Sequence, residues 1–143
     1  MSKTDVLKIL PKLYNKIIVT EEIAEEFGEP LPIWIDIVPV VEKKYMQLLE
    51  QKLDKGESSA IALAITLDNV LLIMDDLKAR KEARCLGLKI TGTLGVLYRA
   101  KQKGIIPALK PIIDQLLLAD FRIAPHIIHE VLALCGEIQE GVS

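Results

Sequence analysis

Two adjacent aspartates, Asp75 and Asp76, follow a short apolar run at residues 70–74. Such a run is typical of a strand in a parallel sheet, and in open α/β sheets ligand sites form beyond the carboxyl ends of the strands. Carboxylates there can hold Mg²⁺ or Mn²⁺, because these ions take hard oxygen ligands. The structural alternative is that Asp76 caps the next helix and Asp75 is a turn residue.

Two glutamates are weaker candidates for the same chemistry. Glu57 opens an apolar helix, where it either points into the same cleft or stabilises the positive end of that helix. Glu26 lies on a helix expected to begin after Thr20, and glutamates on helices are commonly exposed. From the residues alone, either glutamate is a ligand or a helix residue without chemistry.

Basic residues follow the aspartates along one expected helix, and they form either a phosphate-contact surface or a solvated face. They are Lys78, Arg80, Lys81 and Arg84. Beyond them, Thr91 and Thr93 flank Gly92 just before another helix. This turn either offers N–H groups and hydroxyls to a phosphate or serves only as a cap.

Helical and extended patterns alternate along the chain, and this order predicts an α/β domain. Strands are predicted over residues 17–19, 33–38, 70–74 and 88–90. Helices are predicted over residues 4–13 with an end or bend at Pro11, and over 20–28, 41–53, 57–67, 76–86, 93–103, 112–118 and 125–135. The continuous apolar run at 70–74 suits a strand that is covered on both faces.

The composition indicates one domain over residues 1–143, with 50% hydrophobic and 27% charged residues. The net charge of −2 and the 4% aromatic content give no global signature of nucleic-acid binding and disfavour base stacking on an aromatic platform. No apolar stretch is long enough for a membrane span, and the N-terminus lacks the apolar core of a signal peptide. Cys85 and Cys135 have no metal-ligand spacing, so reduced thiols in the cytoplasm are expected.

Other kinds of site find little support in the sequence. His126 and His129 lie three positions apart on an expected helix, but no third zinc ligand is near them. The chain carries no Ser-His-Asp signature, no P-loop and no GxGxxG fingerprint. The acidic residues therefore remain the candidates for catalysis.

Three segments together resemble the PIN-like family DUF3368. They are LPKLYNKIIVTEEIAEEF at 10–27, GESSAIALA to AKQKGIIP at 56–107, and DFRIAPHIIHEVLALCGE at 120–137. The resemblance implies a three-layer α/β/α fold with a parallel sheet, in which about four acidic residues hold Mg²⁺ or Mn²⁺ and hydrolyse RNA. Many PIN proteins are toxins of toxin–antitoxin pairs, which implies RNA and an antitoxin-like protein as partners and suggests a homodimer.

The resemblance also assigns the acidic positions. Glu26 matches the acidic residue on the helix after the second strand, and Glu57 matches the one that opens the buried helix. Asp75 and Asp76 match the acidic pair after the fourth strand, and Asp76 is the nearer match to the family's recurring aspartate. The expected function is a metal-dependent ribonuclease.

One departure from the family pattern weakens this expectation. PIN domains open with a central strand that ends in a ligand aspartate, in a pattern like VSDTSPLI, whereas this sequence begins at the following helix. Two neighbouring strands are expected to lose their shared partner. Three explanations are open: a late start site, a degenerate copy, or a partner or swapped segment that fills the gap. The alternative functions are a non-catalytic nucleic-acid- or protein-binding module and a structural subunit completed by another chain.

Overall fold

The structure, a computed structural model, describes residues 8–118. The chain divides into two compact units. We call residues Lys16–Thr93 the strand unit, and Met1–Asn15 with Leu94–Ser143 the helical unit. The helix expected at 125–135, with His126, His129 and Cys135, lies outside the described residues.

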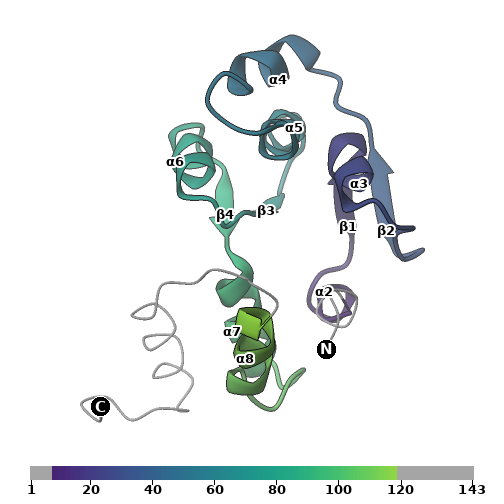
Figure 1. The fold of residues 1–143 in the computed structure, drawn as a ribbon, viewed down its shortest axis with the longest axis vertical. Helices are drawn as coiled ribbons and strands as arrows, with labels where there is room; N and C mark the ends of the chain where they lie inside the picture. The colour runs from purple at the N-terminus through teal and green to yellow at the C-terminus, as the bar shows by residue number, and fades with distance from the viewer. Residues whose placement is uncertain (1–7, 119–143) are drawn as a thin grey trace. The chain divides into compact units, whose positions relative to one another are not determined.

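The strand unit contains two parallel pairs of strands (Figure 1). β1 (Ile17–Thr20) pairs with β2 (Ile35–Val38), and β3 (Leu71–Ile73) pairs with β4 (Lys89–Thr91). The parallel α/β architecture expected from the sequence is confirmed. However, no hydrogen bonds join β1 to β3, so the strands form two separate sheets.

The split leaves β1 and β3 each with one edge that has no strand partner in residues 8–118. That two neighbouring strands lack a shared partner stays a prediction, since residues 1–7 and 119–143 lie outside the described part of the chain. Leu71 and Ile73 of β3 are 41% and 39% exposed. The expectation of a strand covered on both faces is therefore wrong for β3.

Four helices complete the strand unit: α3 (Glu21–Phe27), α4 (Lys43–Leu49), α5 (Lys55–Ala64) and α6 (Leu77–Cys85). α5 contacts both β1 and β3 and packs against the other three helices, so it is the centre of the unit. Its side chains Ile61 and Ala62 are fully buried, as the apolar pattern on every side of this helix predicts. Met46 and Leu49 of α4 belong to the same core.

A buried hydroxyl pair joins β1 to α5. Thr20 Oγ1 and Ser59 Oγ are 2.7 Å apart, and the Ser59 hydroxyl also donates to the carbonyl of Gly56 at 2.7 Å. Thr20 Oγ1 in addition accepts from the backbone N–H of Ile23, which makes Thr20 the predicted N-cap of α3. Gly28 ends α3 with φ of 72°, a left-handed conformation that glycine adopts at little cost.

The described part of the helical unit contains α2 (Leu10–Leu13), α8 (Lys110–Leu118) and, except for its first residue, α7 (Thr93–Gln102). Leu97, Leu109 and Ile113 are almost fully buried in its core. Pro11 lies in the first turn of α2, where a proline lacks no hydrogen bond. Residues 4–7 of the expected helix lie outside the described residues, so its end or bend at Pro11 stays a prediction. No helix within residues 8–118 is long and apolar enough to cross a membrane.

Candidate functional site

Asp54 and Glu57 cap the N-terminus of α5 reciprocally, because the side chain of each accepts a hydrogen bond from the backbone N–H of the other. Asp54 accepts a hydrogen bond from the backbone N–H of Glu57 at 2.8 Å, and Glu57 accepts one from the N–H of Asp54 at 3.3 Å. This is a capping box, so the helix begins at Lys55, two residues before the expected start. Asp54 was not among the predicted site residues, although its spacing of three from Glu57 is a capping signal.

Glu57 is the described acidic residue with a raised pKa. Burial of its side chain raises the pKa, and the negative charges of Asp54 and Asp76 raise it further, whereas the hydrogen bond from the Asp54 backbone lowers it. Asp76 follows β3, so a residue outside α5 contributes to the raised pKa of Glu57. The N-terminus of α5 and the carboxyl end of β3 therefore meet in one negatively charged region.

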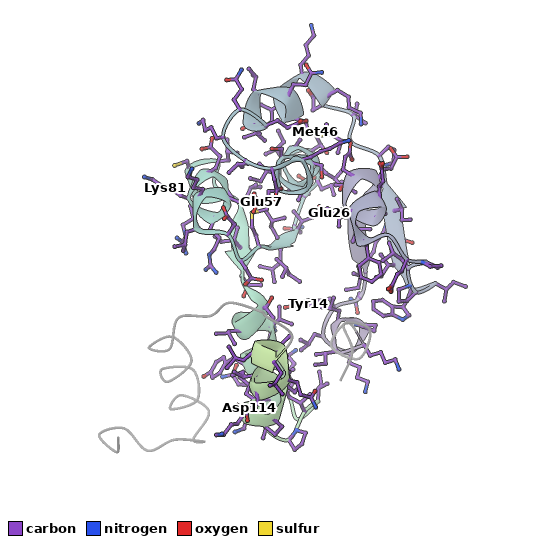
Figure 2. All side chains as sticks on the ribbon, viewed as in Figure 1. Tyr14, Glu26, Met46, Glu57, Lys81 and Asp114 are labelled. Atoms are coloured by element: carbon purple, nitrogen blue, oxygen red, sulfur yellow. The ribbon has the colours of Figure 1, made fainter. Side chains whose placement is uncertain are left out.

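Glu26 lies over the first turn of α5. A Cβ atom added at Gly56 would be 2.6 Å from Glu26 Oε2, so the carboxylate occupies space that a larger residue would need. Figure 2 labels Glu26 on α3 and Glu57 on α5, two helices that contact one another. The structure thus places Glu26 and Glu57 at the same end of the central helix.

Asp76 also serves as the N-cap of α6. Its Oδ2 accepts from the backbone N–H of Ala79 at 3.0 Å, which is the structural alternative considered from the sequence. Its other oxygen, Oδ1, makes no hydrogen bond that the structure describes. A cap role and a further role for the second oxygen are therefore compatible.

Asp75 points to a different partner. It accepts from the backbone N–H of Thr93 at 2.8 Å and from the Thr93 hydroxyl at 2.5 Å. The carboxylate thereby satisfies the first residue of α7, where negative charge is favourable. The Thr93 groups that were expected to face a phosphate are thus bonded to Asp75 in this structure.

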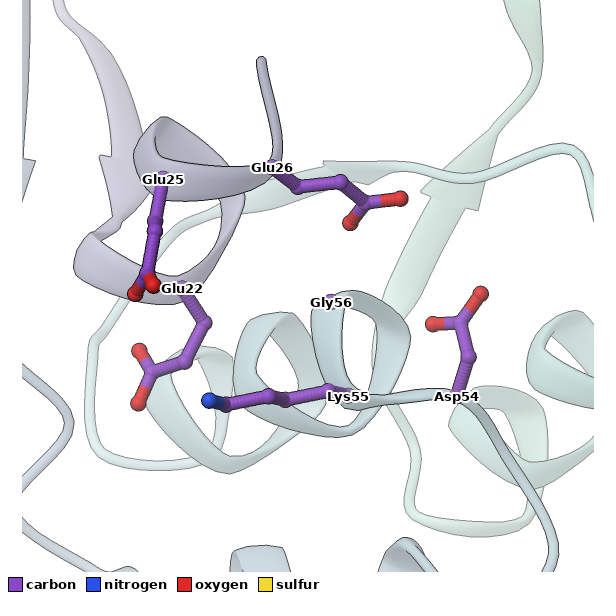
Figure 3. Close-up of a pocket in the computed structure, with 6 residues that line it drawn as sticks. All are labelled: Glu22, Glu25, Glu26, Asp54, Lys55 and Gly56. Atoms are coloured by element: carbon purple, nitrogen blue, oxygen red, sulfur yellow. The ribbon is translucent and has the colours of Figure 1, made fainter. Parts of the chain in front are cut away.

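An open pocket of about 370 Å³ adjoins Glu26. It is lined by Glu22, Glu25, Glu26, Asp54, Lys55 and Gly56. In Figure 3 the Glu25 carboxylate points towards Glu22, whereas Glu26 points the other way, to the side of Asp54. The acidic side chains therefore form two groups rather than one cluster.

Glu22 is held by Lys43. Its side chain is only 8% exposed, and its Oε2 accepts from Lys43 Nζ at 3.2 Å. Burial alone raises the pKa of Glu22, but its own backbone N–H, Lys43 and the charge of Lys55 outweigh burial and lower it. Glu22 is therefore an ionised carboxylate that is paired with Lys43.

The basic residues expected to contact phosphate lie on α6. Lys78, Lys81 and Arg84 are exposed, and Figure 2 labels Lys81 on this helix. Arg80 is half-buried, with its Nη1 2.8 Å from where a Cβ at Gly92 would lie. Three of the four basic side chains are thus free to reach a ligand, and Arg80 packs over the Thr91–Thr93 turn.

Residues 1–137 match the family DUF3368, described as a PIN domain. The chain belongs to this PIN-domain family. No curated protein and no solved structure matches the chain.

PIN domains generally use divalent metals, and the carboxylates of this PIN domain have the right donor chemistry. Their positions do not complete a metal site, because no three Asp, Glu, His or Cys side chains within residues 8–118 lie close enough to share an ion. Glu57 and Asp76 are joined to helix N-termini, and Asp75 is bonded to Thr93. The described residues alone therefore do not fit a bound metal ion.

Proposed function

We propose that this PIN domain is a ribonuclease that requires Mg²⁺ or Mn²⁺. The supporting observations are that Glu26 lies over Gly56 in the first turn of α5, that Glu57 belongs to this turn, and that the charge of Asp76 raises the pKa of Glu57. Family membership supports the same class of reaction, hydrolysis of a phosphodiester bond. Because the described carboxylates do not form an ion-binding set, the proposal requires that at least one further oxygen ligand joins them.

The exposed face of α6 would bind the RNA backbone. Lys78, Lys81 and Arg84 project from one short helix that begins at Asp76. Phosphate contacts by such side chains release counterions, so binding should weaken as the salt concentration rises. We further propose that this ribonuclease is the toxin of a toxin–antitoxin pair, with an antitoxin-like protein as its partner.

The test compares cleavage of a mixed set of labelled RNAs in Mn²⁺ and in EDTA. Asp76→Asn is the informative variant, because asparagine caps a helix as well as aspartate does but is a poorer metal ligand. Asp68→Asn, at an exposed position in the turn before β3, is the matched control. Cleavage that EDTA abolishes, and that only Asp76→Asn loses, supports the proposal; equal cleavage by all three proteins contradicts it.

The second candidate is a non-catalytic nucleic-acid-binding module on the same fold. It is favoured by the hydrogen bonds that Glu57, Asp75 and Asp76 already make to backbone groups. This candidate predicts salt-sensitive RNA binding without turnover, measured by fluorescence anisotropy. Lys81→Ala with Arg84→Ala should weaken binding, whereas Lys44→Ala on α4 should not.

A further inference from the structure

The open pocket between α3 and the first turn of α5 has a lining that the proposed activity does not explain. Four carboxylates and one lysine ammonium group line it, so negative charge is in excess there. All of these residues belong to the strand unit. The pocket volume of about 370 Å³ is large enough for a small molecule, and the charge favours a cationic one.

One buried oxygen of Glu22 lacks a hydrogen-bond donor. The Glu22 side chain is 8% exposed, and its Oε2 accepts from Lys43 Nζ at 3.2 Å. Its Oε1 is also buried, but it has no hydrogen-bond partner among residues 8–118, because even its own backbone N–H does not reach hydrogen-bond geometry with this oxygen. A buried carboxylate oxygen without a donor costs free energy. A cationic N–H group that enters the pocket would supply this donor.

The acidic side chains offer acceptors at two separate places in the pocket. In Figure 3 the Glu25 carboxylate points towards Glu22, whereas Glu26 points to the side of Asp54. Gly56 leaves room for the second pair, because a Cβ atom there would lie 2.6 Å from Glu26 Oε2 and 3.7 Å from Asp54 Oδ1. The lining therefore holds two pairs of carboxylates rather than one cluster.

This division distinguishes between kinds of cation. A divalent metal ion needs several oxygen ligands around one centre. No three Asp, Glu, His or Cys side chains in the part of the chain that the structure describes lie close enough to share an ion. An alkyl chain with an ammonium group at each end instead needs two acceptor groups that lie apart. Each ammonium group carries three N–H donors, and its hydrogen bonds to carboxylates are charge-assisted.

We propose that this pocket binds a linear aliphatic diamine, with one ammonium group at Glu22 and Glu25 and the other at Glu26 and Asp54. The first ammonium group donates to Glu22 Oε1, the buried oxygen that lacks a donor. Lys55 lines the same pocket and opposes binding through its positive charge. The inference does not rest on ribonuclease activity, because binding is measured without RNA and without a metal ion.

Isothermal titration calorimetry of the full chain tests the proposal. The probes are the unbranched diamines from 1,3-diaminopropane to 1,6-diaminohexane, each compared with the monoamine of the same chain length. We expect saturable binding of at least one diamine, about tenfold tighter than that of its monoamine, since the second ammonium group adds charge-assisted hydrogen bonds. This binding should weaken as the salt concentration rises. Equal affinities within every pair, or no saturable binding, would overturn the proposal.

Protein variants locate the binding site. Glu25→Gln removes an exposed carboxylate of the first pair and should weaken diamine binding several-fold. Glu21→Gln, at an exposed residue of the same helix that does not line the pocket, is the matched control and should leave binding unchanged. Lys55→Gln removes the opposing charge and should strengthen binding several-fold. Equal affinities of the Glu25 and Glu21 variants, or weaker binding by Lys55→Gln, would overturn the proposal.

Glu22→Gln tests the buried oxygen directly. Glutamine keeps an oxygen but removes the negative charge, so diamine binding should weaken about tenfold, as for loss of a hydrogen bond to a charged group. A urea titration of this variant checks that it is folded, because its pairing with Lys43 is also weakened. Diamine-induced shifts in the amide NMR signals should map to residues 22–26 and 54–56; shifts confined to other segments would overturn the proposal.

Discussion

The carboxylate of Asp75 receives two hydrogen bonds from Thr93, one from the backbone and one from the hydroxyl. This pair joins the end of β3 to the start of α7 across 18 residues of sequence. The sequence allowed two roles for the Thr-Gly-Thr turn, a phosphate contact and a helix cap, and the phosphate contact stays a prediction. The turn presents Thr93 to an internal carboxylate.

Removing this contact should cost stability. Asp75→Ala is expected to lower the free energy of unfolding by about 1 kcal/mol, as for loss of a helix N-cap. Thr93→Val removes only the hydroxyl bond and should cost less. In urea titrations the double variant should show a coupling about as large as the cost of Thr93→Val, because both changes remove the same hydrogen bond. Strict additivity would contradict a direct interaction between the two side chains.

Two glycines should respond differently to the same substitution. A Cβ at Gly92 would be 2.8 Å from both Asp75 Oδ1 and Arg80 Nη1, and Asp75 is held in place by Thr93. Gly92→Ala should therefore destabilise the protein by roughly 1–3 kcal/mol, as overpacking does. Thermal melts of Gly92→Ala and of Gly56→Ala compare the stabilities of the two variants.

Gly56→Ala is the comparison. Its Cβ would meet Glu26 Oε2, the far end of an exposed side chain that can rotate away. Because alanine favours a helix by about 1 kcal/mol over glycine, Gly56→Ala should be neutral or stabilising. A loss of stability as large as that of Gly92→Ala would show that Glu26 is fixed in position.

The cap role of Asp76 can be separated from any chemical role. Asp76→Asn should retain the hydrogen bond from Ala79 and change stability little, whereas Asp76→Ala should cost about 1 kcal/mol. Chemical denaturation of both variants gives the two values. A large loss of stability in Asp76→Asn would mean that the charge itself, rather than the cap, supports the fold.

The buried hydroxyls of Thr20 and Ser59 should be sensitive to isosteric replacement. Thr20→Val leaves the N–H of Ile23 without its cap and removes a partner of Ser59, so it should cost roughly 1–3 kcal/mol. Thr20→Ser keeps the oxygen and should cost much less. Equal losses of stability in both variants, measured by urea unfolding, would assign the effect to the methyl group.

Glu57 should make stability depend on pH. Its pKa is raised in the folded state, so the folded state binds the proton more tightly and loses stability as the pH rises from 4.5, the ordinary value, through the raised value. Glu57→Gln keeps an oxygen for the Asp54 N–H and removes the charge. It should stabilise the protein at pH 7 and have less effect at pH 4.

Urea midpoints at the two pH values provide the measurement. Glu50→Gln, on an exposed residue after α4, is the control and should show no such pH dependence. A constant difference between wild type and Glu57→Gln at pH 4 and pH 7 would exclude a raised pKa at Glu57.

The sequence predicted local structure well wherever a cap or turn residue carried the signal. Thr20 caps α3, Gly28 ends it, and Asp76 caps α6, because each acts on backbone groups only a few positions away. The acidic residues could be named, but their partners could not. Asp75 bonds to Thr93, and the charge of Asp76 raises the pKa of Glu57. Both interactions depend on how separate elements pack.

Strand ends and burial were less predictable for the same reason. Ile33 is 99% exposed and precedes β2, although its apolar character suggested the start of a strand. The exposure of Leu71 and Ile73 depends on which strand lies beside them, and a local apolar pattern contains no information about that neighbour. The pairing itself, parallel and joined by single helices, followed from the alternation of elements.

The separate strand pairs have a kinetic consequence. Ile17 pairs with Ile35 and Leu71 with Lys89, so in each pair the partners are 18 residues apart. The two strands of each strand–helix–strand segment are close in sequence, so they can pair without contacts to a distant part of the chain. Formation of the two ladders should therefore be fast and independent, and docking of α5 on both is the step expected to limit the folding rate of the strand unit.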